Sequence, residues 1–164
     1  MDRKAIDALV TERRLHQVNP SFSRAEMLIG RARKDLGAIP KIVEASEEIA
    51  YTTAFEAMFK ATLALMAVHG FRLGTVEQRK AGVQFLRATL PAGLESVLAA
   101  FDKMRQRRND LSYDAGVVVS RTDADEASKQ AAILIEAIGK LVDPAIAESK
   151  AKGNRGKGQP PSSR

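Results

Sequence analysis

The segment 45–68 constrains the fold most, because apolar side chains cover most of its circumference when it is drawn as a helix. Its apolar positions are Ile49, Ala50, Ala54, Phe55, Met58, Phe59, Leu63, Leu65 and Met66. After Lys60 it carries no charge up to the end of the segment at His69 and Gly70. A helix that is apolar nearly all round belongs in the centre of a bundle or in an interface. We therefore expect this helix to be central and one side of it to contact another subunit.

Helical spacing of apolar residues also recurs along the rest of the chain, whereas strand-like alternation is nearly absent. The other predicted helices cover residues 3–16, 23–36, 75–90, 91–111 and a last long segment from 122 onward. Sequences typical of capping boxes begin at Ser23 and Thr75, Gly37 and Pro40 are expected to end the second helix, and Pro144 to kink the last. The sequence therefore predicts an all-α protein, an antiparallel up-and-down bundle of four to five long helices, with 117–119 as an extended connection.

The positive charge is concentrated at the C-terminal end. The chain has 26 Lys and Arg against 20 Asp and Glu, a net charge of +6, and five of the basic residues but no acidic one lie at or after Lys150. Residues 1–149 are thus almost neutral. We divide the chain into an N-terminal helix (1–20), a helical bundle (21–149) and a disordered basic tail (150–164), which either attracts nucleic acid without sequence preference or only aids solubility.

Composition excludes several classes of protein. There is no cysteine, which rules out a disulfide scaffold, a thiol nucleophile and a thiolate zinc site. The longest charge-free apolar run, 61–68, is far shorter than the roughly 20 residues that span a bilayer, and the first residues lack the apolar core of a signal peptide. We expect a cytoplasmic protein with no membrane segment, no metal site and no cofactor.

Arg108 is the position that departs from the helical pattern. The predicted helix 91–111 has a buried stripe formed by Leu94, Val97, Leu98, Phe101, Met104 and Leu111. Arg108 lies four residues after Met104 and three before Leu111, within this stripe, where a guanidinium is costly unless it has a partner. It needs an acid, backbone carbonyls, a second chain or an anionic ligand. The simpler alternative is that Arg105, Arg107 and Arg108 complement the negative end of the helix dipole, with Asp110 or Asp114 neutralising an arginine.

The residues around Arg108 carry a resemblance to a known family. The stretch 108–114, Arg-Asn-Asp-Leu-Ser-Tyr-Asp, resembles the Arg-Asn-x-x-x-(His/Tyr) signature of HEPN domains. The segment 48–57 is similar to the second core helix of that family, and His69-Gly70-Phe71 is similar to the turn after it. The resemblance covers residues 23–142.

This resemblance implies an antiparallel helical bundle that dimerises and brings two copies of the motif into one cleft. Many members are metal-independent ribonucleases of toxin–antitoxin or phage-defence systems, and others bind nucleotides or RNA or pair with a small nucleotidyltransferase. By resemblance Arg108 contacts the phosphate, Asn109 orients the site and Tyr113 takes the place of the catalytic histidine, with Arg105, Arg107 and Asp114 as flanking binding residues.

The tyrosine is a departure that bears on catalysis. Histidine titrates near neutral pH and can act as a base and as an acid, whereas tyrosine, with a pKa near 10, is a poor base there. His16 and His69 are expected at a helix end and at a turn, and neither is expected to replace it. Tyr113 can still stack on a base or bond a phosphate.

Two hypotheses follow from the sequence. The first is a HEPN-like homodimer that binds RNA or a nucleotide, with weak or lost ribonuclease activity, in a toxin–antitoxin or defence module. The second is a non-catalytic interaction protein in which Arg108 forms an internal ion pair and the apolar third helix docks a partner such as a nucleotidyltransferase.

Overall fold

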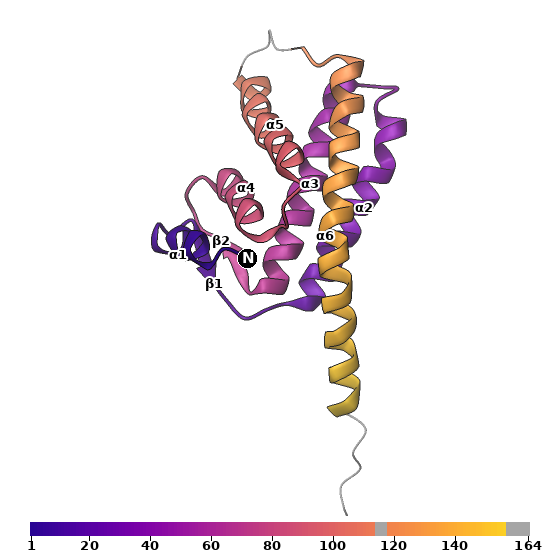
Figure 1. Cartoon of the computed structure of the whole chain (residues 1–164). Coiled ribbons are helices and arrows are strands. Elements are labelled where there is room, and N and C mark those ends of the chain that lie inside the picture. The colour runs from indigo at the N-terminus through magenta and orange to yellow at the C-terminus, as the bar shows by residue number, and fades with distance from the viewer. Residues whose placement is uncertain (114–117, 157–164) are drawn as a thin grey trace, which may run out of the picture.

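The computed structural model describes residues 1–113 and 118–156, with the side chains of residues 109, 111–113 and 154–156 left aside. These residues form six helices and two short strands, which confirms the predicted all-α helical bundle (Figure 1). In chain order the elements are α1 (Arg3–Thr11), β1 (Leu15–Gln17), α2 (Phe22–Ile42), α3 (Glu47–His69), β2 (Phe71–Leu73), α4 (Gln78–Thr89), α5 (Glu95–Tyr113) and α6 (Arg121–Gly156).

Helices α2, α3 and α6 pack lengthwise, and α2 runs antiparallel to the other two (Figure 1). Three ion pairs connect α6 to α2 and to the turn after it, at three levels of the bundle. Lys150 pairs with Glu26, Arg33 with Asp143, and Arg121 with Glu44 of the turn. The start of α6 therefore lies beside the turn between α2 and α3, and its later turns lie beside the start of α2.

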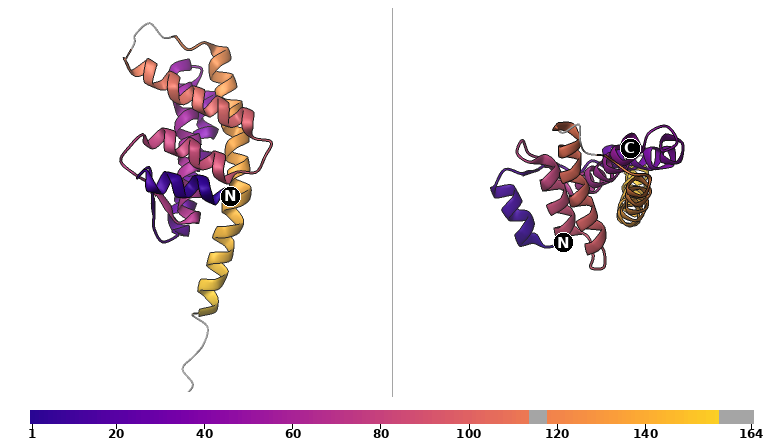
Figure 2. Two further views of the ribbon diagram at one scale, coloured as in Figure 1. Left: turned by 60° about the vertical axis from the view of Figure 1, so that its left-hand side comes forward. Right: turned by 90° about the horizontal axis from the view of Figure 1, so that it is seen from above.

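Helices α1, α4 and α5 form a second layer that crosses the long helices steeply (Figure 2). Helix α3 lies between the two layers, in contact with α2 and α6 on one side and with α4, α5 and β2 on the other. Its buried residues are Ala50, Tyr51, Ala54, Phe55, Ala57, Met58, Ala61, Thr62, Ala64, Leu65, Met66 and Ala67. The central position predicted for this helix is confirmed. Ile49, near its start, is 58% exposed, and contact of one side with a second subunit stays a prediction.

The chain reverses direction where a continuous first helix was predicted. Helix α1 ends at Thr11 rather than near His16, and Arg13 adopts a left-handed conformation with φ of 56°. The next residues form β1, which pairs antiparallel with β2 so that Leu15 lies opposite Leu73. Leu15 is fully buried, so packing of this two-stranded sheet replaces the last turn of the predicted helix.

Helix α2 begins at Phe22 with Ser21 at its N-cap position, two residues earlier than the Ser23 capping box predicts. It also continues past Gly37 and Pro40, so the predicted end at these residues is wrong. Ile39 and Val43, on either side of Pro40, are both buried. Their packing offsets the cost of about 1 kcal/mol that an interior glycine carries.

Three other helix boundaries differ from the prediction. Helix α4 is capped by Glu77 rather than Thr75, and α5 starts at Glu95 rather than Pro91. Helix α6 is capped by Ser120, whose hydroxyl accepts from the Asp123 N–H while the Asp123 carboxylate accepts from the Ser120 N–H. It continues past Pro144 and includes residues 150–156 of the predicted tail; residues 157–164 lie outside the described part. Within that part, no helix is both long and apolar enough to cross a membrane.

Candidate functional site

Arg108 lies on α5 and contacts α3 at Phe55 and Glu56. Its Nη2 is 2.8 Å from the Glu56 Oε1, and its guanidinium carbon lies 5.7 Å from the centroid of the Phe55 ring. Phe55 is fully buried and also packs against Phe101 of α5. About 25% of the Arg108 side chain remains accessible. Arg108 thus has the acidic partner that its place in an apolar stripe requires, and it stays partly open to solvent.

Glu56 contacts a second arginine from another helix. The Arg79 Nη2, from α4, is 3.7 Å from the same Glu56 Oε1. The Arg79 Nε is buried and has no hydrogen-bond partner among the described residues. Lys60, which lies one turn after Glu56 on α3, donates instead to Asp35 of α2. Glu56 therefore links α3 to both α4 and α5.

Arg107 points in a different direction and joins α5 to the start of α6. Its Nη2 donates to the Asp123 carboxylate at 3.0 Å and to the Val118 carbonyl at 2.7 Å, and its guanidinium lies over the Tyr51 ring. The bond from Arg107, with two bonds from Ser120, holds the pKa of Asp123 at about 2, well below its usual value. Burial raises the pKa of Tyr51. These contacts make Arg107 a residue that holds the two helices together.

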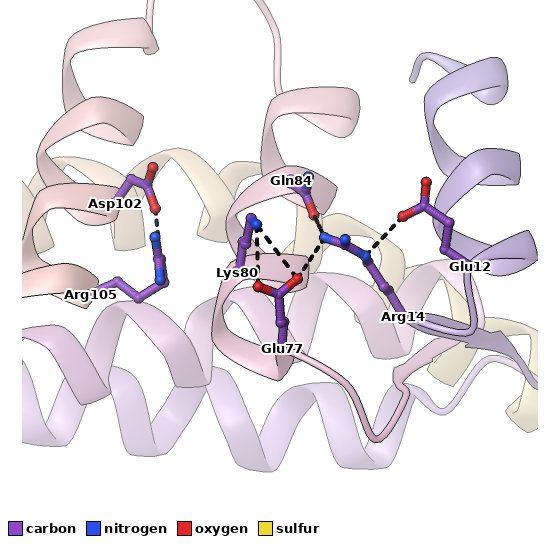
Figure 3. Close-up of polar contacts among 7 residues, drawn as sticks. All are labelled: Glu12, Arg14, Glu77, Lys80, Gln84, Asp102 and Arg105. Carbon is purple, nitrogen blue, oxygen red and sulfur yellow. Dashed lines mark hydrogen bonds and ion pairs between the residues drawn. The ribbon is translucent and has the colours of Figure 1, made fainter. Parts of the chain in front are cut away.

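Arg105 pairs with Asp102 one turn earlier on α5, at 2.7 Å (Figure 3). The Arg87 Nη2, from α4, lies 3.5 Å from the other oxygen of the Asp102 carboxylate. Figure 3 also shows that Glu77 of the α4 N-cap lies between Lys80 and Arg14, 3.2 Å and 3.1 Å away. The Arg14 Nε completes this chain of contacts with Glu12 at 2.8 Å.

A polar pocket of about 480 Å³ opens between the start of α4 and α5. It is lined by Thr75, Glu77, Gln78, Arg79, Lys80 and Arg105. No pattern in the sequence groups these residues, because Arg79-Lys80 is typical of an ordinary solvated pair and lies more than twenty residues from Arg105. Only the packing of α4 on α5 brings the three cations to one pocket.

The remaining predicted site residues follow Arg108 along the chain. Asn109 and Tyr113 belong to the last turns of α5, and their side chains lie outside what the structure describes. Asp114 lies outside the described residues altogether. Of the predicted set, the structure thus describes the surroundings of Arg105, Arg107 and Arg108, which contact three different carboxylates.

Both histidines lie at the other end of α3 from Arg108. His69 ends α3, 13 residues after Glu56, which corresponds to about 20 Å along a helix. It is exposed at the end of the helix, its ring packs edge-on against Phe85, and desolvation by the surrounding residues lowers its pKa. His16 lies on β1, which pairs with the strand that follows His69. Neither histidine of this chain can reach a phosphate bound at its own Arg108.

No group of acidic and histidine side chains suited to a metal ion occurs in residues 1–113 and 118–156. The chain matches no family model, no curated protein and no solved structure at a significant level.

Proposed function

We propose that the protein is a HEPN-like protein that binds RNA or a nucleotide, with Arg108 as the residue that contacts a phosphate. The observation that carries the proposal is the setting of this side chain. It sits on the Phe55 ring, is oriented by Glu56, and keeps about a quarter of its surface accessible at the end of α5. A guanidinium held in one orientation is well suited to grip a phosphate through two parallel hydrogen bonds.

The charge around Arg108 supports an anionic ligand. Arg79 shares Glu56 with Arg108, and Arg79 and Arg105 line the same pocket. The three arginines come from two helices that meet on one side of α3. An anion near Glu56 would be attracted by more than one guanidinium, and the partial burial of these groups reduces the screening by salt.

Binding is better supported than cleavage. A general base must lie within hydrogen-bond distance of the hydroxyl that it deprotonates. His69 lies about 20 Å along α3 from Glu56, the partner of Arg108, and His16 lies on the strand that pairs with the one after His69. Tyrosine at position 113 is a poor base at neutral pH. A weaker form of the proposal keeps residual metal-independent ribonuclease activity, in which Arg108 stabilises the charge that develops on the phosphate.

The rival function is that of an interaction protein. The Arg108–Glu56 ion pair is what this alternative expects. Its second element, an apolar third helix available for docking, has less support, because most of α3 is covered by other helices of the same chain and Ile49 is the one exposed large apolar residue that the structure describes on it. The two functions differ in what the loss of Arg108 does to RNA binding.

The test is a titration of labelled single-stranded RNA against the wild type, Arg108→Ala and Arg108→Lys. We expect the alanine variant to bind about tenfold more weakly, because a charge-assisted hydrogen bond is lost. The lysine variant keeps the charge but loses the two-bond geometry and should fall between the two. Equal binding by all three proteins would contradict the proposal.

Arg33→Ala is the matched control. Arg33 also pairs with one carboxylate, that of Asp143, but it lies between α2 and α6. The Arg33→Ala substitution removes the same charge as Arg108→Ala. It should leave RNA binding within about twofold of the wild type, since a distant surface charge has little effect on a local contact. Cleavage is tested by incubating RNA with the protein and a chelator; products that disappear in Arg108→Ala would support the ribonuclease form.

The proposal includes a homodimer with a shared cleft. It also includes a place in a toxin–antitoxin or defence module, with a nucleotidyltransferase as a partner. These parts of the proposal come from the resemblance alone. Sedimentation equilibrium of the full chain tests the dimer, for which we expect twice the mass of 17.8 kDa. A nucleotidyltransferase gene adjacent to the gene for this chain would support the module.

A further inference from the structure

Carboxylates are shared between basic residues on the side of the molecule formed by α4, α5 and the turn before β1. Glu56 contacts Arg79 and Arg108, Glu77 contacts Lys80 and Arg14, and Asp102 contacts Arg105 and Arg87. We call these six basic side chains the basic face: Arg14, Arg79, Lys80, Arg87, Arg105 and Arg108. Glu12 is the one further carboxylate that contacts them, through Arg14, in the described part of the chain. The contacts thus join more cations than anions.

The long helices on the other side show the opposite balance. Arg33, Lys140, Lys150 and Lys152 each contact one carboxylate that no other described basic residue contacts. Arg121 contacts two carboxylates, those of Glu44 and Asp125. Among the side chains that form ion pairs, the excess of cations therefore lies on one side of the fold, whereas residues 1–149 as a whole are nearly neutral.

The basic face is continuous. Arg108 and Arg79 meet at Glu56, Arg79 shares the pocket with Lys80 and Arg105, and Lys80 and Arg14 meet at Glu77 (Figure 3). The row of side chains crosses from α5 over α4 to the turn before β1. A single phosphate would occupy only one part of this row, whereas a polymer with regularly spaced phosphates can occupy all of it.

We propose that the basic face binds the phosphodiester backbone of an RNA strand over several nucleotides, with the pocket between α4 and α5 as a phosphate subsite next to Arg108. The identity of the ligand rests on the proposed function. One feature of the pocket favours phosphate: its three cations come from both helices. Five of the six basic residues are arginines, whose planar groups match phosphate oxygens.

The sharing of carboxylates allows the face to be tested without loss of the fold. In Arg79→Gln, Lys80→Gln, Arg105→Gln, combined in one chain, each carboxylate keeps its other partner: Arg108 for Glu56, Arg14 for Glu77 and Arg87 for Asp102. The matched control combines Arg33→Gln, Arg121→Gln and Lys140→Gln, which removes the same charge from the other side. Both variants keep the basic C-terminal residues, whose own attraction for RNA therefore cancels in the comparison.

Binding of a labelled single-stranded RNA of about 20 nucleotides is measured against salt concentration for these two variants, the wild type and Arg108→Ala. Each phosphate contact contributes about 0.7 to the slope of log affinity against log salt for single strands. We expect the basic-face variant to lose about 2 from this slope and at least tenfold in affinity at about 0.1 M salt. The control variant should keep the wild-type slope.

The outcomes separate this inference from the proposed function. If Arg108→Ala binds weakly but the basic-face variant binds like its control, the inference is overturned and the proposed function stands. If only the basic-face variant binds weakly, the inference stands and the role of Arg108 is overturned. Equal effects of the two triple variants would overturn the inference, and so would ATP or inorganic polyphosphate binding as tightly as RNA with the same loss in the basic-face variant.

Discussion

Arg107 and Arg108 are adjacent in sequence, yet they contact different parts of the molecule. Successive residues on a helix point about 100° apart, so Arg107 reaches Asp123 at the start of α6 while Arg108 reaches Glu56 on α3. The sequence pointed to Arg108 because it interrupts an apolar stripe. It carried no comparable signal for Arg107, whose partner lies on the next helix. The structure thus gives Arg107 a contact between α5 and α6, and the ligand-binding role expected for it stays a prediction.

Asp123 gives a prediction at this scale. Its pKa is held at about 2 in the folded chain, against a usual value of 3.8, by Arg107 and Ser120. A carboxyl with a depressed pKa stabilises the fold above its unfolded pKa, and this contribution is lost as the pH falls from about 4 to about 2. We expect Asp123→Asn to lower the free energy of unfolding at pH 7 by about 1 kcal/mol, because the neutral amide loses the charge-assisted hydrogen bond from Arg107. Its stability should also fall less steeply below pH 4.

Urea denaturation at several pH values measures both effects. Asp125→Asn is the control, because Asp125 forms an exposed i, i+4 pair with Arg121, and such pairs contribute little. A wild type and an Asp123→Asn variant with parallel pH profiles would contradict the explanation.

At the scale of elements, helices that bury a regular stripe were predictable, and their ends were not. Helix α2 continues past Gly37 and Pro40 because Ile39 and Val43 are buried by neighbours that are distant in the sequence. The two-stranded sheet of β1 and β2 was not predicted, for the same reason. Each strand has three residues, too few for an alternating pattern, and their pairing joins segments more than fifty residues apart.

Gly74 tests the close approach between the end of β2 and the residues just before β1. A Cβ at this position would lie 1.9 Å from the Arg13 carbonyl oxygen, which is part of the backbone and cannot turn aside. We expect Gly74→Ala to lower the free energy of unfolding by about 3 kcal/mol through this overpacking.

Gly30→Ala is the matched substitution. Gly30 lies within α2, and a Cβ there meets nothing within 4 Å. Alanine should raise the free energy of unfolding by about 1 kcal/mol, because it restricts the unfolded chain and fits the helix. Urea denaturation of the two variants should therefore give changes of opposite sign; a tolerated Gly74→Ala would contradict the close approach.

At the scale of the whole molecule, α6 extends beyond the rest of the bundle at its C-terminal end (Figure 1). Its last buried residue is Ile146, which is 7% exposed. After it, Lys150 reaches Glu26 in an exposed ion pair, and Lys152 pairs with Glu148 of its own helix. Such pairs add little to stability, so the fold should not depend on the residues after Glu148.

Truncation after Glu148 should therefore change the free energy of unfolding by less than about 1 kcal/mol. Truncation after Val142 also removes Ile146 from the core and should cost about 2 kcal/mol or more. Thermal unfolding of both proteins measures the difference. A large loss in the longer protein would mean that the end of α6 has a structural role, and its RNA binding shows how much of the affinity comes from the basic C-terminal residues.

The sequence by itself determined that the chain is a helical bundle around the segment 45–68, since apolar periodicity and burial go together along a helix. It also singled out Arg108, because a charge in an apolar stripe is visible without coordinates. The tertiary structure alone decided which carboxylate that arginine contacts and that Arg14, Arg79, Lys80, Arg87 and Arg105 share one side of the molecule with it. The physical reason is that periodicity is a property of one element, whereas ion pairs and charged surfaces depend on how elements distant in the sequence are packed together.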